Sequence, residues 1–123
     1  MIQELSAKAC HDLREADPSI LLIDVRTREE CARGRPAGSV NIPVFLAGAG
    51  GMTPNPAFVA EVEQVAPDRA RRLVLSCAAG RRSMMAAEQL AAAGWQNLIS
   101  LRGGWGGNDD DPGWLAAGLP VER

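Results

Sequence analysis

Short apolar runs that alternate with helical patterns limit the folds open to this chain. Ile20 to Ile23 is continuously apolar, which is typical of a strand buried on both faces of a parallel sheet. Leu73 to Ser76 and Asn97 to Leu101 are predicted to be further strands, and Val40 to Ile42 a shorter one. Strands and helices that alternate in this way form parallel βαβ units with helices on both faces of the sheet. We therefore predict an α/β fold.

Four helices are predicted, over residues 6–15, 27–33, 56–67 and 83–93. Ser6 can cap the first helix, and Thr27-Arg28-Glu29-Glu30 has the spacing of a capping box for the second. Residues 43–56 are rich in glycine and proline and are predicted to be a long connection. Within it, Gly48 to Gly51 is expected to be a flexible surface loop that can act as a flap.

The stretch from Leu73 to Ser83 carries the strongest chemical signal. The predicted strand stops at Cys77, and a loop of small residues with one glycine and two arginines leads into the helix from Ser83. Such a loop can turn backbone N–H groups inward, and the helix adds its positive end at the same place. Cysteines in these surroundings ionise more readily than a free thiol. We therefore expect Cys77 to be a nucleophilic thiolate.

Asp24 and Arg26 follow the strand at Ile20 to Ile23, much as Cys77 follows its own strand. Functional groups of open α/β sheets collect beyond the carboxyl ends of the strands. Asp24 and Arg26 are therefore expected to border the same crevice. Either they support the chemistry there, or Asp24 has a structural role in which it binds loop N–H groups or pairs with an arginine.

The loop Cys77-Ala78-Ala79-Gly80-Arg81-Arg82-Ser83 resembles the active-site loop of the rhodanese sulfurtransferases, which reads Cys, two residues, Gly, one residue, Arg, Ser. Further segments resemble the same family in the same order: 21–26, 38–43, 94–98, 101–105 and 114–121. Two positions depart from its pattern, because Cys31 stands where an aromatic residue is common and Arg35-Pro36-Ala37-Gly38 replaces a His-Ile-Pro-Gly segment. The resemblance implies one rhodanese-like domain over residues 1–123, with three α/β/α layers around a mostly parallel sheet of about five short strands.

The resemblance also implies a reaction. Cys77 would take the outer sulfur of a donor anion such as thiosulfate, and the resulting persulfide would pass that sulfur to cyanide or to the thiol of a protein or small molecule. The donor is expected to bind the loop, whose residues are Ala78, Ala79, Gly80, Arg81, Arg82 and Ser83. Arg82 would hold the donor's oxygens and Gly80 would allow the tight backbone path. Arg81 is expected either at the pocket mouth or in solvent.

Two other functions remain open. The chain can be a sulfur carrier or interaction module that turns over poorly with small donors. It can also be a cysteine-dependent phosphatase or arsenate reductase, although those loops place five residues between cysteine and arginine whereas four lie between Cys77 and Arg82. A cysteine protease is disfavoured because His11 is the only histidine and lies on a predicted surface helix.

Composition limits the classes of binding partner and the cellular compartment expected for this chain. A formal charge of -2 and a pI near 5.4 argue against nucleic acid, and no apolar run approaches the length of a membrane span. The three cysteines and one histidine offer no metal-ligand spacing, so no cofactor is expected beyond the Cys77 persulfide itself. Cys10 lies on the apolar face of the first predicted helix and is predicted to be a small buried side chain. An odd cysteine count without a CxxC pair suits a reducing, cytoplasmic location.

Overall fold

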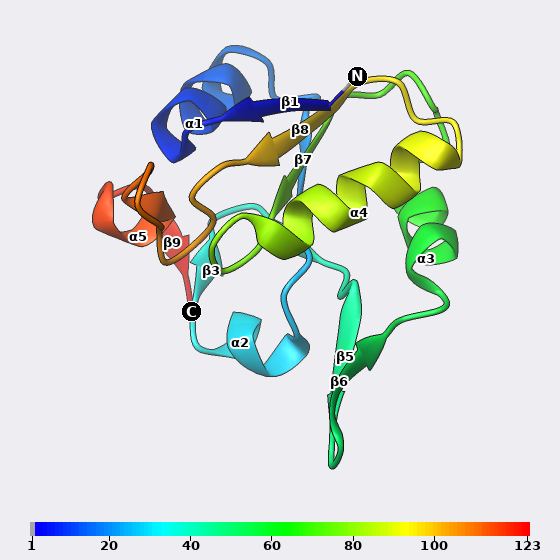
Figure 1. The fold of residues 1–123 in the computed structure, drawn as a ribbon. Coiled ribbons are helices and arrows are strands. Elements are labelled where there is room, and N and C mark those ends of the chain that lie inside the picture. The colour runs from blue at the N-terminus through cyan, green and yellow to red at the C-terminus, as the bar shows by residue number, and fades with distance from the viewer. Residues whose placement is uncertain (1) are drawn as a thin grey trace.

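The computed structural model describes residues 2–123 (Figure 1). In chain order its elements are β1 (Ile2–Leu5), α1 (Ala7–Ala16), β2 (Leu21–Asp24), α2 (Arg28–Ala32), β3 (Arg35–Pro36), β4 (Val40–Asn41), β5 (Phe45–Gly48), β6 (Gly51–Pro54), α3 (Phe58–Val65), β7 (Leu73–Ser76), α4 (Arg81–Ala92), β8 (Leu98–Leu101), α5 (Gly113–Ala116) and β9 (Val121–Glu122).

Within residues 2–123, five strands form a central sheet in the order β1-β8-β7-β2-β4, and every neighbouring pair is parallel. The register places Asp24 opposite Ser76 on β7 and opposite Asn41 on β4. These three strands therefore end side by side, and the residues that follow Asp24 and Ser76 emerge at one edge of the sheet.

Each face of the sheet carries a hydrophobic core of its own. Leu73 and Leu75 pack with side chains of α3 and α4, whereas Val74 between them packs with side chains of α1 and α5. Figure 1 shows α4 crossing one face of the sheet while α1 lies on the other. The predicted α/β/α layering is confirmed, and the fully buried β7 explains why its sequence lacks polar alternation.

The connection predicted over residues 43–56 is wrong in part. Residues 45–54 form an antiparallel hairpin, β5 with β6, which turns at Ala49 and Gly50 and projects away from the body of the protein (Figure 1). Every residue of β6 is exposed. The glycine-rich segment is the hairpin's turn, and main-chain pairing organises it without any buried apolar stripe.

Two helix starts are set by local chemistry. Thr27 and Glu30 form the predicted capping box, in which the hydroxyl of Thr27 accepts from the N–H of Glu30 and the Glu30 carboxylate accepts from the N–H of Thr27. Helix α4 begins at Arg81, two residues earlier than predicted, because Gly80 acts as its N-cap with φ of 100°. Ser83 therefore lies inside the first turn of α4.

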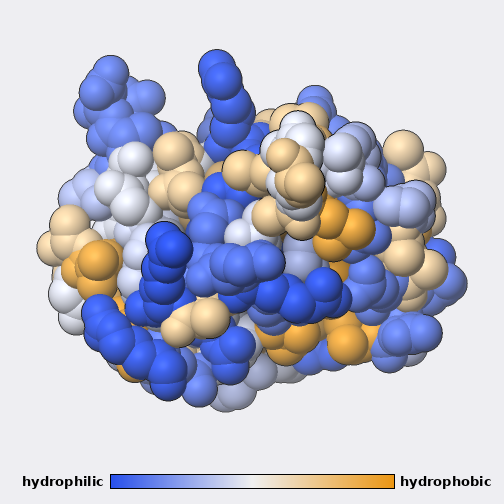
Figure 2. Space-filling model, turned by 90° about the horizontal axis from the view of Figure 1, so that it is seen from below, coloured by the Kyte–Doolittle hydropathy of each residue, from blue (hydrophilic) through white to orange (hydrophobic). Residues whose placement is uncertain are grey.

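No helix within residues 2–123 combines the length and the apolar character needed to span a membrane. Seen from the side where α2 and the β5–β6 hairpin lie, the surface is largely hydrophilic, with hydrophobic side chains in separate small patches (Figure 2). Met52 on β6, at 55%, is the most exposed of the large apolar side chains among residues 2–123.

Candidate active site

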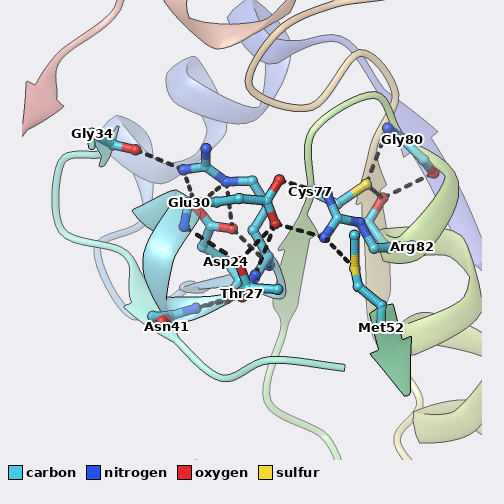
Figure 3. A network of polar contacts seen from close by, with 11 residues as sticks. Asp24, Thr27, Glu30, Gly34, Asn41, Met52, Cys77, Gly80 and Arg82 are labelled. Atoms are coloured by element: carbon cyan, nitrogen blue, oxygen red, sulfur yellow. Dashed lines mark hydrogen bonds and ion pairs between the residues drawn. The ribbon is translucent and has the colours of Figure 1, made fainter. Parts of the chain in front are cut away.

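Cys77 lies between the carboxyl end of β7 and the amino end of α4. Its Sγ atom accepts a hydrogen bond from the backbone N–H of Gly80 at 3.1 Å, and Figure 3 shows the sulfur turned toward Gly80. Only 1% of Cys77 is exposed. Cys77, the nucleophile expected from the sequence, therefore lies in a strand-to-helix loop, with its sulfur held below the surface.

The loop around the sulfur is held from outside by the segment that follows β8. The N–H of Trp105 donates to the Cys77 carbonyl at 2.7 Å, and the N–H of Gly106 donates to the Ala78 carbonyl at 2.8 Å. The side-chain amide of Asn108 donates to the Ala79 carbonyl at 2.9 Å. These contacts use the loop's carbonyl groups, which leaves its N–H groups available to an anion.

A glycine is required at position 80 both by the backbone conformation and by the space available for a side chain. Its φ of 100° belongs to the left-handed region, and a Cβ atom there would overlap the carbonyl oxygen of Arg102. The expected function of Gly80 in the tight backbone path is thus supported by a specific contact. Arg81, the next residue, is exposed.

A pair of buried hydroxyl groups lies behind the sulfur. The Sγ of Cys77 is 3.5 Å from the Oγ of Ser83, which donates to the Gly80 carbonyl at 3.0 Å. The Oγ of Ser100 on β8 lies 2.8 Å from the same Ser83 oxygen. Ser83 was expected in the loop, but Ser100 was missed, because nothing in a buried strand sequence indicates which serine faces the active site.

Arg82 makes its strongest contact with a carboxylate that the sequence assigned only to helix capping. Its Nη1 and Nη2 donate to the two carboxylate oxygens of Glu30 at 2.7 and 2.9 Å. The Arg82 guanidinium holds the pKa of Glu30 down to about 2 against the opposing effect of burial, and the N–H of Thr27 adds to this. Nη1 also lies 3.8 Å from the Sδ of Met52 on the hairpin (Figure 3).

The guanidinium expected to be free for donor oxygens is therefore shared with Glu30. Arginine has five N–H donors, so a bidentate carboxylate does not use all of them. Arg82 joins three segments that are distant in sequence, namely α2, the start of α4 and the hairpin.

Asp24 and Arg26 form a buried ion pair of their own. The guanidinium of Arg26 donates from Nε and Nη2 to the Asp24 carboxylate, with the shortest contact at 2.8 Å, and Nη2 also donates to the Gly34 carbonyl at 2.7 Å. Asn41 donates to both main-chain carbonyls of the pair. Among the described residues neither side chain hydrogen-bonds to Cys77. Of the two expectations for these residues, the geometry favours tying down the loop.

The other two cysteines are buried and free, as is Cys77. Burial raises the pKa of the Cys10 and Cys31 thiols to about 12, so both stay protonated at neutral pH. Within residues 2–123 no group of three or more histidine, cysteine or carboxylate side chains is arranged to hold a metal ion.

Comparison with known proteins identifies the family of this chain. The chain matches the Rhodanese-like domain family over residues 6–108, and it belongs to that family. It is 33% identical over 120 residues to thiosulfate sulfurtransferase 16, chloroplastic, of Arabidopsis thaliana, covering 96% of this chain and 91% of that protein. It spans about half the length of two further curated relatives.

Solved structures give the same fold. The crystal structure of Rv0390 from M. tuberculosis superposes with a TM-score of 0.81 at 25% identity, covering 98% of this chain and 96% of that one. A thiosulfate sulfurtransferase from Pseudomonas aeruginosa superposes with a TM-score of 0.75 at 26% identity, covering 99% of this chain but 20% of that one.

Proposed function

We propose that this protein is a sulfurtransferase that moves sulfane sulfur from a donor such as thiosulfate to a thiophilic acceptor through a persulfide on Cys77. The observation that carries the proposal is the position of the Cys77 sulfur, which accepts the Gly80 N–H at 3.1 Å at the start of α4. Donor, intermediate and leaving group are all anions, and a helix start with the Gly80 N–H turned toward the sulfur favours each of them.

In the first half-reaction the Cys77 thiolate attacks the outer sulfur of thiosulfate. A new S–S bond forms to Cys77, the S–S bond of thiosulfate breaks, and its electron pair leaves with sulfite. In the second half-reaction cyanide or an acceptor thiolate attacks the outer sulfur of the persulfide, and Cys77 leaves as a thiolate. No external oxidant or reductant is needed, because each step breaks one S–S bond as it forms one S–S or S–C bond. The electron pair leaves with sulfite in the first step and with the Cys77 thiolate in the second.

The Ser83 hydroxyl can hydrogen-bond to the sulfur in both protonation states of Cys77. A protonated Cys77 donates to the Ser83 oxygen, which lies 3.5 Å away. When Cys77 is a thiolate, the Ser83 hydroxyl can turn from the Gly80 carbonyl toward the sulfur while Ser100 donates to the Ser83 oxygen. The pair of hydroxyl groups would thus serve both protonation states without moving a backbone atom.

Access to Cys77 requires neighbouring side chains to move, because the residue is only 1% exposed. Arg82 and the exposed Met52 lie on the hairpin side of the sulfur, so they are the side chains that we expect to shift when a donor enters (Figure 3). Part of Arg82 remains available to donor oxygens, since Glu30 takes one N–H from each terminal nitrogen.

The burial of Cys77 and the pairing of Arg82 with Glu30 also favour a second candidate, a sulfur carrier that loads readily but turns over slowly with small donors. Its acceptor would be a thiol-bearing protein or small molecule in a reducing compartment such as the cytoplasm, where the free cysteines would remain reduced. The proposal requires no cofactor other than the Cys77 persulfide.

Mass spectrometry tests the proposal directly. Thiosulfate should add the mass of one sulfur atom to the wild-type protein and none to Cys77→Ser. A steady-state thiosulfate:cyanide assay then separates the two candidates, since a readily formed adduct with negligible turnover favours the carrier. Absence of any adduct with thiosulfate, together with Cys77-dependent hydrolysis of an aryl phosphate, would replace both candidates with a phosphatase.

A further inference from the structure

A pocket of about 370 Å³ lies away from the catalytic loop, between α1, the turn after β3 and the segment from α5 to β9. Its walls include His11 and Arg14 from α1, Gly38 from the turn, and Trp114 and Pro120 from the C-terminal segment. The volume falls within the range of about 300–1,000 Å³ that is typical of small-molecule sites. None of the loop residues 77–83 lines this pocket.

Hydrogen bonds hold the walls of this pocket in place. The carbonyl oxygen of Pro120 accepts the indole N–H of Trp114 at 2.7 Å and the backbone N–H of Ala37 at 3.0 Å. The N–H of Gly38 donates to the Glu122 carboxylate. The turn and the C-terminal segment are thereby tied together, so the pocket is formed without a ligand.

Arg14 brings to this pocket a positive charge that has no ion-pair partner among residues 2–123. Its Nε atom is buried and has no hydrogen-bond partner, and among residues 2–123 no carboxylate forms an ion pair with its guanidinium. Burial lowers the pKa of Arg14, with Glu15 opposing the change. A buried donor without a partner is uncommon in folded proteins and calls for a bound water or ion.

Glu15, the acidic neighbour of Arg14, and Glu122, which binds the Gly38 N–H, both have other partners. Glu15 has a side chain that is 70% exposed, and its carboxylate lies 3.5 Å from the Nε2 of His11. Glu122 accepts from Gly38. The rest of the wall is largely apolar, because the His11 ring meets the Trp114 indole edge to face at 5.8 Å and prolines flank them. The sequence placed His11 on a solvated surface, but its side chain is only 20% exposed.

We propose that this pocket binds a small carboxylate with an apolar body. The carboxylate pairs with the Arg14 guanidinium, whose planar fork matches two carboxylate oxygens, and the apolar body lies against Pro18, Pro120 and the ring of His11. Cys77 does not line this pocket, so a test of carboxylate binding does not depend on whether the protein transfers sulfur.

A nitrogen-15 NMR titration of the full chain tests the site, with benzoate as the probe and sodium sulfate at matched ionic strength as the comparison. Benzoate should give saturable shifts of the Trp114 indole N–H, the Gly38 amide and the Arg14 Nε–H. Arg14→Gln should weaken benzoate binding at least 10-fold. Arg33→Gln, which removes an exposed arginine at the end of α2, should leave it unchanged.

Three results would overturn the proposal. Benzoate shifts that do not saturate would show that the pocket has no specific binding site for benzoate. Equal binding of sulfate would mean that the pocket holds an adventitious ion only. Unchanged affinity in a folded Arg14→Gln variant would remove the assigned contact. Should the spectrum of that variant show an unfolded protein, His11→Ala takes its place, with an expected loss of at least 3-fold in benzoate affinity and the same refutation if affinity is unchanged.

Discussion

Replacing Glu30 with glutamine isolates the charge that pairs with Arg82 beside Cys77, the proposed nucleophile. A glutamine keeps the side-chain oxygen that accepts from the N–H of Thr27, so the capping box of α2 survives. What is lost is the carboxylate charge facing the Arg82 guanidinium at 2.7 and 2.9 Å. The substitution therefore measures how strongly this ion pair stabilises the loop that carries Cys77.

The magnitude follows from the pKa of Glu30. A fall from the ordinary value of 4.5 to about 2 corresponds to about 3 kcal/mol of preferential stabilisation of the folded carboxylate. The side chain of Glu30 is 30% exposed and Thr27 supplies part of the effect, so solvent screening reduces the expected loss to about 1–2 kcal/mol. Because the folded pKa lies below the unfolded value, this stabilisation is present above about pH 4.5 and disappears as the pH falls toward about 2.

Urea unfolding followed by tryptophan fluorescence at pH 7, 5 and 3 measures the effect. The difference in unfolding free energy between wild type and Glu30→Gln should be about 1–2 kcal/mol at pH 7 and smaller at pH 3. Glu29→Gln removes the same charge from an exposed neighbour in the same helical turn, and should change stability by less than about 0.5 kcal/mol. A Glu30→Gln variant as stable as wild type at pH 7, or equally destabilised at every pH, would refute the reasoning.

Three further substitutions test the site. Arg82→Ala should lower kcat/KM for thiosulfate about 10- to 100-fold, the worth of one charge-assisted hydrogen bond, while His11→Ala changes it less than about 2-fold; equal losses would contradict the assignment. Gly80→Ala should slow persulfide formation about 100-fold in stopped-flow assays, because a Cβ overlaps the Arg102 carbonyl and displaces the loop; an unchanged rate would show that the loop adapts. Asp24→Asn, which leaves a buried guanidinium without its carboxylate, should cost about 3–5 kcal/mol in unfolding free energy by urea denaturation, and a cost under about 1 kcal/mol would make the pair dispensable.

The sequence predicted those parts of the molecule that local chemistry determines. The buried strand β7 is visible as an apolar run, and the Thr27 capping box is visible as a spacing of polar residues. The loop after β7 is visible because a cysteine, small residues and Gly80 separate an apolar run from a helical pattern. The predicted start of α4 was wrong by two residues, because its N-cap is the left-handed Gly80, which lacks the side-chain oxygen that usually marks a helix start.

The strands at the margins of the fold could not be predicted in the same way. β1 reads Ile-Gln-Glu-Leu, with exposed polar side chains on an edge strand, and it is stabilised by pairing with β8, which lies more than 90 residues away in sequence. The β5–β6 hairpin buries only part of its first residues, chiefly Phe45, which packs against the core, and every residue of β6 is exposed, so its sequence shows neither apolar alternation nor a buried run. Main-chain pairing between distant or exposed segments leaves little trace in side-chain pattern.

The pairing of Glu30 with Arg82 shows why a loop motif alone does not define the electrostatics of its site. Glu30 already has a complete local explanation as a capping residue, and its second partner is 52 residues away. With that carboxylate in place, the net charge of the pair is zero. An anion at Cys77 would then be stabilised largely by the Gly80 N–H and by the positive end of α4. Among residues 2–123 no carboxylate contacts the sulfur and offsets these two effects. The backbone path imposed by Gly80 is therefore as central to the proposed chemistry as the arginine in the motif.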